Sequence, residues 1–225
     1  MLLSEMEWQA VTLTLQLAAT STILLLLLGT PLALWLSRQR GTTGAFIEAL
    51  VALPLVLPPT VLGFYLLLML APDALPGKIW AGVTGTQLAF SFPALVIGSV
   101  LYSMPFVVQP LQQAFSRVSQ PLLDAAATLG ANRRDQFFSV ILPLSKRSIV
   151  VAAALGFAHT VGEFGVVLMI GGNIPGETQV LSIALYDHVE ALDYDRAHRL
   201  AFGLVGFSLL LLFLLYRNRG WRLGR

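Results

Sequence analysis

A histidine and a glutamate lie four residues apart in a long apolar stretch of this chain. His159 and Glu163 share one face of a helix, because residues i and i+4 are neighbours on its surface. An ionisable group at the centre of a membrane helix costs about 2.5–3.5 kcal/mol or more, so it usually faces a partner or a cavity. A carboxylate also repels an anion. We therefore expect Glu163 to support structure or gating, paired with His159, a backbone donor or a neighbouring subunit, rather than to hold an anionic substrate.

Further candidate residues lie beside prolines and glycines. Pro175 and Gly176 suit the two corners of a type II turn, near which the Thr178 hydroxyl and backbone N–H groups could meet an oxyanion. An ordinary outer turn explains the same residues equally well. Thr60 follows a proline pair, and small residues along the helix of His159 allow close helix packing. The predicted pathway and gate residues are Thr60, His159, Thr160, Gly162, Glu163, Pro175, Gly176 and Thr178.

Residues 117–147 form a polar, arginine-bearing segment, called here the polar segment. Its pattern predicts two short helices, because Pro121 suits a first helical position, Gly130 a left-handed stop and Asn132 a cap. We expect Pro143 to follow the end of the second helix. The first helix carries an apolar stripe suited to docking on another protein or to lying on a bilayer: Leu122, Ala125, Ala126 and Leu129.

The composition places these residues in a membrane protein. The chain has 225 residues, of which 56% are hydrophobic and 12% charged, about half the charge of an average soluble domain. A bilayer core of about 30 Å takes about 20 helical residues to cross. We expect a single all-α domain over residues 1–225, a polytopic helical bundle without room for a second soluble domain. The five predicted spans are residues 8–36, 46–71, 86–108, 149–170 and 200–216.

Prolines interrupt the second and third predicted spans. A proline inside a helix frees a carbonyl and kinks the helix, which is tolerated where the freed group faces protein or a water-filled cavity. Packing kinks are one interpretation, and helices that line a path are the other, which the number of prolines favours. The five prolines are Pro54, Pro58, Pro59, Pro93 and Pro105.

The distribution of Lys and Arg predicts the orientation. Under the positive-inside rule, we expect the N-terminus to lie outside and the C-terminus in the cytoplasm. Three of the fourteen basic residues then lie outside, namely Lys78, Arg196 and Arg199. The other eleven lie inside, namely Arg38, Arg40, Arg117, Arg133, Arg134, Lys146, Arg147, Arg217, Arg219, Arg222 and Arg225.

Several functions find no support in the residues. The chain has no cysteine, which excludes disulfides and thiolate metal sites. The glycine-bearing stretch 82–87 lacks the lysine and spacing of a phosphate-binding loop. No metal-ligand cluster and no pairing of nucleophile with base is visible. We therefore expect no enzyme, no metal, no cofactor bound by this chain and no nucleic-acid partner.

The polar segment resembles a known motif. Its residues Asp124, Ala125, Ala126, Gly130, Leu142 and Pro143 are similar in type and spacing to the EAA loop of the inner-membrane subunits of bacterial binding-protein-dependent ABC importers. Asp124 stands where that family has Glu, and Val140 where it has Ile. Residues 54–59, 162–165 and 173–178 resemble the molybdate importer permeases in particular, and the first two also resemble the sulfate permeases.

The resemblance implies a permease of the bacterial inner membrane. Its EAA loop would form a coupling helix that seats in a groove of a separate ATPase subunit, which uses the ATP. The implied partners are a second copy of the chain, two ATPase subunits, a periplasmic molybdate-binding protein and the lipid bilayer. Sulfate, thiosulfate and tungstate remain alternative cargoes. A secondary transporter or channel that uses His159 and Glu163 for coupling is a second class, although no inverted repeat supports it.

Overall fold

The computed structural model describes residues 3–217, and the regular elements of this part are all helices. Four helices are long and apolar enough to cross a membrane, and a bent pair supplies a fifth if it counts as one span. The predicted all-α membrane bundle is confirmed. The helices are α1 Glu5–Leu36, α2 Thr42–Ala52, α3 Pro59–Leu70, α4 Leu75–Thr84, α5 Phe92–Ser116, α6 Gln120–Thr128, α7 Arg133–Gln136, α8 Leu142–Val161, α9 Gly165–Gly171, α10 Leu181–Glu190 and α11 Tyr194–Arg217, with a 3-10 turn η1 Leu53–Leu55 and a π turn η2 Phe137–Ile141.

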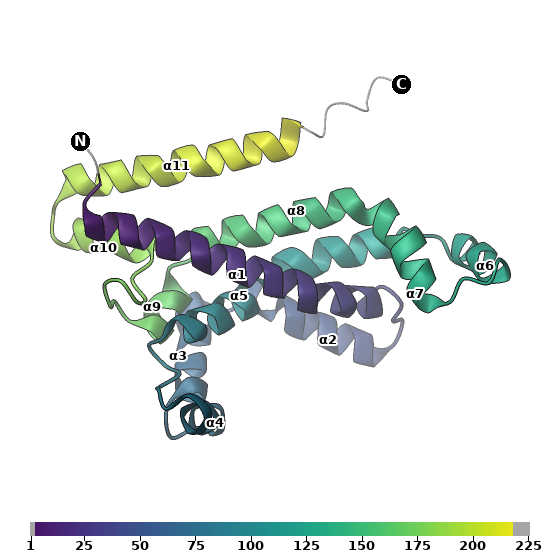
Figure 1. Cartoon of the computed structure of the whole chain (residues 1–225), viewed down its shortest axis with the longest axis horizontal. Helices are drawn as coiled ribbons and strands as arrows, with labels where there is room; N and C mark the ends of the chain where they lie inside the picture. The colour runs from purple at the N-terminus through teal and green to yellow at the C-terminus, as the bar shows by residue number, and fades with distance from the viewer. Residues whose placement is uncertain (1–2, 218–225) are drawn as a thin grey trace.

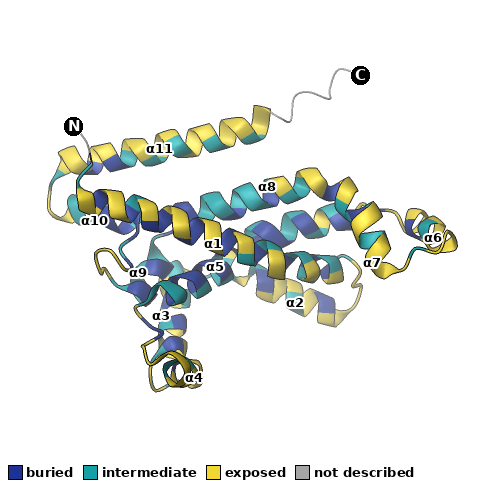
Figure 2. Ribbon diagram, viewed as in Figure 1, coloured by how far each residue is buried: buried dark blue, intermediate teal, exposed yellow. Residues whose placement is uncertain are grey.

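Helices α1, α5 and α8 form the core that positions the rest (Figure 1). On α5, Val107, Val108 and Leu111 are fully buried. Small residues bring the neighbours close, since a Cβ on Gly156 of α8 would lie 2.7 Å from Val107 Cγ2. Helix α11 is peripheral: 6% of its most apolar stretch is buried, against 61% for α5 (Figure 2). Its apolar surface is left to lipid or to another subunit.

The second predicted span is broken rather than continuous. Its two halves, Thr42–Leu55 and Pro59–Leu70, meet at an angle of 109°. Pro58 is extended, with ψ 135°, because the residue before a proline is disfavoured in the helical region. Of the five prolines expected to interrupt spans, Pro105 alone lies inside a helix. The others precede or begin new helices, where a missing N–H costs little: Pro54, Pro58, Pro59 and Pro93.

The next two spans also differ from their predicted bounds. Helix α5 begins at Phe92 rather than at residue 86, because the Ser91 hydroxyl accepts from Ala94 N–H and caps it. The fourth predicted span divides after Val161 into α8 and α9. Gly162 lies at this division, and glycine disfavours continuation of a helix. The result is a second broken helix, which faces the first.

The polar segment folds as two helices joined at Gly130, as predicted. Gly130 has φ +90°, a region that favours glycine, and Asn132 forms a capping box. The expectation that Pro143 follows the end of the second helix is wrong, since residues 133–161 form one helical stretch. Pro143 cannot donate a backbone hydrogen bond, and the turn before it widens, with Leu142 N–H donating to the Phe137 carbonyl five residues back.

The contact between α5 and α8 gives a first prediction. Gly156→Ala places a methyl group against the stiff side chain of Val107, so we expect a loss of about 1–3 kcal/mol in the free energy of unfolding. Gly82→Ala on α4 is the matched control, because a Cβ there meets nothing within 4 Å. Thermal unfolding of the two detergent-purified variants measures the difference. Equal unfolding temperatures would contradict the tight α5–α8 contact.

Candidate functional site

A cavity of about 550 Å³ lies where the two broken helices meet. The start of α3, the middle of α5 and the division between α8 and α9 form its walls. Four predicted pathway residues line it together: Thr60, His159, Gly162 and Glu163. Its other lining residues are Pro59, Tyr102, Ala158, Phe164 and Gly165. The fold thus joins the proline-rich stretch of the second span to the ionisable pair of the fourth.

Glycines hold the two broken helices against each other. A Cβ on Gly165, at the start of α9, would lie 2.7 Å from Pro59 Cβ, and a Cβ on Gly63 of α3 would lie 2.7 Å from Met169 Cβ. Real side chains essentially never approach so closely. Gly165 thus packs directly against Pro59, the first residue of α3.

Glu163 is buried without a partner for its carboxyl group. The residue is 4% exposed, and neither carboxyl oxygen has a hydrogen-bond partner among residues 3–217. The Ser99 hydroxyl on α5 likewise has no hydrogen bond of good geometry within residues 3–217, and it lies close enough to interact with the Glu163 carboxyl group. In the main chain, Ser182 Oγ donates to the Glu163 carbonyl at 2.5 Å. At the division between α8 and α9, the backbone carbonyl of Glu163 therefore has a partner, whereas its carboxyl group has none among the described residues.

His159 is bonded to α5 rather than to Glu163. Its Nδ1 lies 2.9 Å from Ser103 Oγ, and its ring stacks on Phe106 with centroids 3.9 Å apart. Ser103 Oγ also lies 3.2 Å from Thr160 Oγ1, which donates to the Gly156 carbonyl. The expected pairing of His159 with Glu163 is absent from the described structure. Thr160 is buried in this chain of hydrogen bonds and does not line the cavity.

The turn at Pro175 and Gly176 lies apart from the cavity. Glu177 N–H donates to the Ile174 carbonyl, and Gly176 has φ +79°, as the predicted type II turn requires. Thr178 is fully buried, and its hydroxyl donates to the Gly171 carbonyl and accepts from Ile174 N–H. In this conformation the Thr178 hydroxyl cannot meet an oxyanion, and it serves the turn instead.

Sequence reasoning did not select five of the lining residues as pathway residues, namely Pro59, Tyr102, Ala158, Phe164 and Gly165, nor Ser99, which lies beside Glu163. Tyr102 and Ser99 lie one turn apart on α5, and each comes next to Glu163 only through helix packing. Pro59 was noted as a possible kink and instead forms part of the wall. For Ser99 and Tyr102, the one available sequence signal was the run of small and polar residues on α5, which is otherwise apolar.

The polar segment lies at one end of the bundle (Figure 1), and apolar side chains are exposed there. Leu129 is 89% exposed and Phe138 is 64% exposed. Asp124 accepts a hydrogen bond from Gln120, which in turn accepts one from Arg38 at the end of α1. This links the segment to the first span. Of the six residues of the EAA-like motif, four are exposed, and Ala126 and Leu142 are partly buried.

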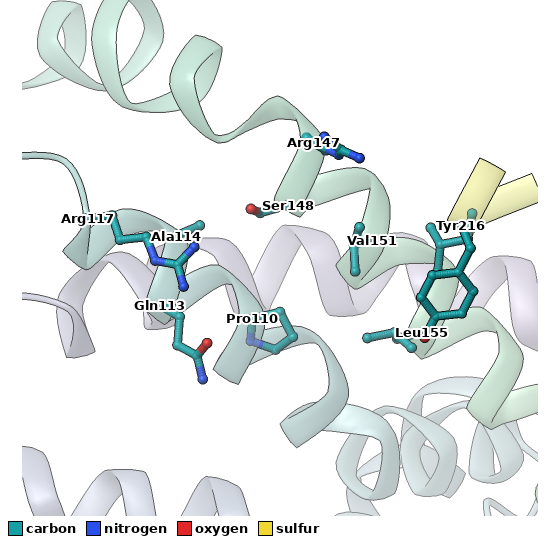
Figure 3. Close-up of a pocket in the computed structure, with 10 residues that line it drawn as sticks. Pro110, Gln113, Ala114, Arg117, Arg147, Ser148, Val151, Leu155 and Tyr216 are labelled. Carbon is teal, nitrogen blue, oxygen red and sulfur yellow. The ribbon is translucent and has the colours of Figure 1, made fainter. Parts of the chain in front are cut away.

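A second cavity, of about 500 Å³, lies between α5, α8 and α11 (Figure 3). Arg117 and Gln113 reach it from α5, Arg147 and Ser148 from α8, and Tyr216 from α11. Its other lining residues are apolar, namely Pro110, Ala114, Val151, Leu155 and Leu215. The two arginines make it basic, unlike the first cavity, and it lies near the start and end of the polar segment.

Comparison with known proteins identifies the family. A family model described as "Binding-protein-dependent transport system inner membrane component" matches residues 13–218. The chain belongs to this family. It is therefore a membrane subunit of a binding-protein-dependent ABC importer, a transport component and not an enzyme. Such importers also contain ATPase subunits and a substrate-binding protein.

Several relatives in this family are close. The chain is 53% identical over 222 residues to "Molybdenum transport system permease protein ModB" of Azotobacter vinelandii, covering 99% of this chain and 98% of that protein. It is 36% identical to the protein of the same name from Escherichia coli K12, covering 84% and 83%. "Sulfate transport system permease protein CysT" of Escherichia coli K12 is 32% identical, covering 79% and 64%.

Solved importers share the fold. A bacterial alginate ABC transporter matches with a TM-score of 0.78 and 18% identity, covering 99% of this chain and 82% of that chain. The MetNI methionine ABC transporter in an inward-facing form matches with a TM-score of 0.71 and 20% identity, covering 96% and 97%. At this level of identity the likeness concerns the fold alone.

The turn at Pro175 and Gly176 gives a second prediction. Thr178→Val keeps the shape of the side chain but leaves the Gly171 carbonyl and the Ile174 N–H without their partner. We expect the free energy of unfolding to fall by about 1–3 kcal/mol, while Thr178→Ser, the matched control, retains both hydrogen bonds. Thermal unfolding in detergent measures this. A stable Thr178→Val variant that fails only in transport would instead indicate a role in binding the cargo.

Proposed function

We propose that this permease carries molybdate across the bacterial inner membrane. The observation that carries the proposal is the 53% identity to a molybdenum permease over almost the whole length of both chains. Residues 173–178, which resemble molybdate permeases, lie in the outer turn, where Asn173 donates two hydrogen bonds to Asp187. The chemistry of the chain alone does not separate molybdate from sulfate, because both are tetrahedral dianions. In this proposal, the cavity that distinguishes molybdate from sulfate belongs to the binding protein rather than to this permease.

The functional unit in this proposal is a homodimer with the transport path along its two-fold axis. A bundle of five spans encloses little space by itself, and most oligomers are symmetric. Helix α11 also leaves most of its apolar surface unburied within one chain. The N-terminus lies in the periplasm and the C-terminus in the cytoplasm. In support, the start of α1 and the polar segment lie at opposite ends of the bundle (Figure 1). Arg219, Arg222 and Arg225, which contribute to this orientation, lie outside the described residues.

The polar segment docks on an ATPase subunit in this proposal. The resemblance to the EAA loop assigns the contact to Asp124, Ala125, Ala126, Gly130, Leu142 and Pro143. The exposed apolar side chains of Leu129 and Phe138 supply burial for such a contact. Because η2 joins the segment to α8 without a gap, a displacement of α6 and α7 moves α8 and the wall of the first cavity. ATP-driven closure of the ATPase pair would be transmitted to the transport path through this helical connection.

The docking surface gives a third prediction. Leu129→Glu places a charge in the expected contact at a position that is 89% exposed, so the fold of the permease has no reason to change. We expect this variant to insert normally and to lose most co-purification with its ATPase subunit. Val83→Glu is the matched control, since Val83 also lies near a helix end, on α4, and is 81% exposed. Equal co-purification of both variants would contradict the docking surface.

The cargo gives a fourth prediction. In cells that lack other oxyanion importers, we expect uptake of molybdate and tungstate at low micromolar levels, with sulfate taken up much more weakly. The measurement is competition of the three anions for uptake by the complete importer. Preferred sulfate uptake would favour the alternative cargo, to which the 32% identity with a sulfate permease points, and would leave the permease assignment intact.

A further inference from the structure

The first cavity contains polar groups but no fixed positive charge. None of its lining residues in the described part of the chain is Lys or Arg. Thr60 and Tyr102 contribute hydroxyl groups, and Glu163 contributes a buried carboxyl group without a partner. Thr60 is also the first residue of α3 after Pro59, so its N–H has no preceding helical carbonyl to bond. A polar site of this kind suits a guest that accepts hydrogen bonds.

The hydrogen bonds around His159 determine how it faces this site. Thr160 gives its one hydroxyl hydrogen to the Gly156 carbonyl, so in the contact between Ser103 and Thr160 the donor is Ser103. Ser103 has then used its own hydrogen and accepts from His159 Nδ1–H. This tautomer leaves neutral His159 with Nε2 as an acceptor. His159 therefore needs no charge to satisfy its contacts and supplies none to Glu163.

The state of the Glu163 carboxyl group follows from its surroundings. A buried carboxylate without a cation beside it is very unfavourable, and such a group takes up a proton instead. The titratable groups that share the cavity are His159 and Tyr102, and neither is a fixed cation. A protonated carboxyl group has one O–H to donate. A buried neutral carboxylic acid that donates to an oxyanion has a precedent in enzyme sites.

We propose that Glu163 carries its proton and donates a hydrogen bond to a tetrahedral oxyanion in transit, together with the Thr60 hydroxyl. The inference rests on the proposed function, because the oxyanion is the transported cargo. Neutral donors hold a dianion more weakly than Arg or Lys would. Such weak binding suits an ion that passes through the site and is not retained there. The repulsion that argues against Glu163 as an anion ligand applies only to its ionised form.

Two substitutions of Glu163 test the donor role. Glu163→Gln keeps a donor, whereas Glu163→Met has similar length and none. In proteoliposomes that contain the complete importer and its binding protein, we expect Glu163→Gln to retain at least about half of the molybdate uptake rate and Glu163→Met to lose about tenfold or more. We expect Glu163→Met to unfold at the native temperature or above, since it removes an unsatisfied buried group. Equal loss of uptake in both variants, or unfolding of Glu163→Met at a clearly lower temperature, would overturn the proposal.

A cysteine probe tests the charge of the cavity without measuring transport. The native chain has no cysteine, so Thr60→Cys gives the permease a single thiol at the cavity. In the purified complex, we expect an anionic methanethiosulfonate to label it at least as fast as a cationic one of similar size, and molybdate to slow both reactions. Much faster labelling by the cationic reagent would indicate an ionised Glu163, and no effect of molybdate would place the ion elsewhere. Either result would overturn this proposal. The proposed function is tested separately, because it stands as long as the native importer takes up molybdate normally.

Discussion

A helix can break inside a membrane only if protein groups satisfy the polar groups and surfaces that the break exposes. This chain breaks two of its spans, between α2 and α3 and between α8 and α9, and packs the breaks against each other. Gly165 makes this possible, because any larger residue would collide with Pro59. Ser182 then satisfies the carbonyl of Glu163. The cavity, its donors and its unsatisfied carboxyl group all result from this one contact.

The helical core provides the rigid frame that such a contact requires. Helix α5 is buried between α1 and α8 and carries the side chains that face the second break, among them Ser103 and Tyr102. Helix α8 connects the frame to the polar segment without interruption, because the π turn before Pro143 widens the helix instead of ending it. The same helical stretch thus has exposed apolar residues at one end and the cavity wall at the other. In the proposed function, this continuity provides the mechanical route from the ATPase to the path.

The two cavities differ in a way that matters for an anion. The cavity between α5, α8 and α11 has Arg117 and Arg147 at its wall, whereas the lining of the cavity at the breaks has hydroxyl groups and the Glu163 carboxyl group but no Lys or Arg. In our proposal that carboxyl group is neutral. A dianion that met fixed cations within the membrane would bind tightly and leave slowly. Neutral donors allow brief binding. The distribution of charge therefore keeps strong attraction away from the place where the helices are interrupted.

The sequence by itself determined the membrane bundle, the family and the local turns. Long apolar runs have one solution in lipid, and short-range chemistry settles a capping box at Asn132 or a left-handed turn at Gly130. Tertiary structure alone decided where the spans break and which groups meet there. Proline marks a possible interruption, but whether it kinks a helix, as Pro105 was expected to, or begins one, as Pro59 does, depends on what packs against it. The partner of His159 proved to be Ser103 rather than Glu163, because helix packing and not spacing along the chain sets which side chains touch.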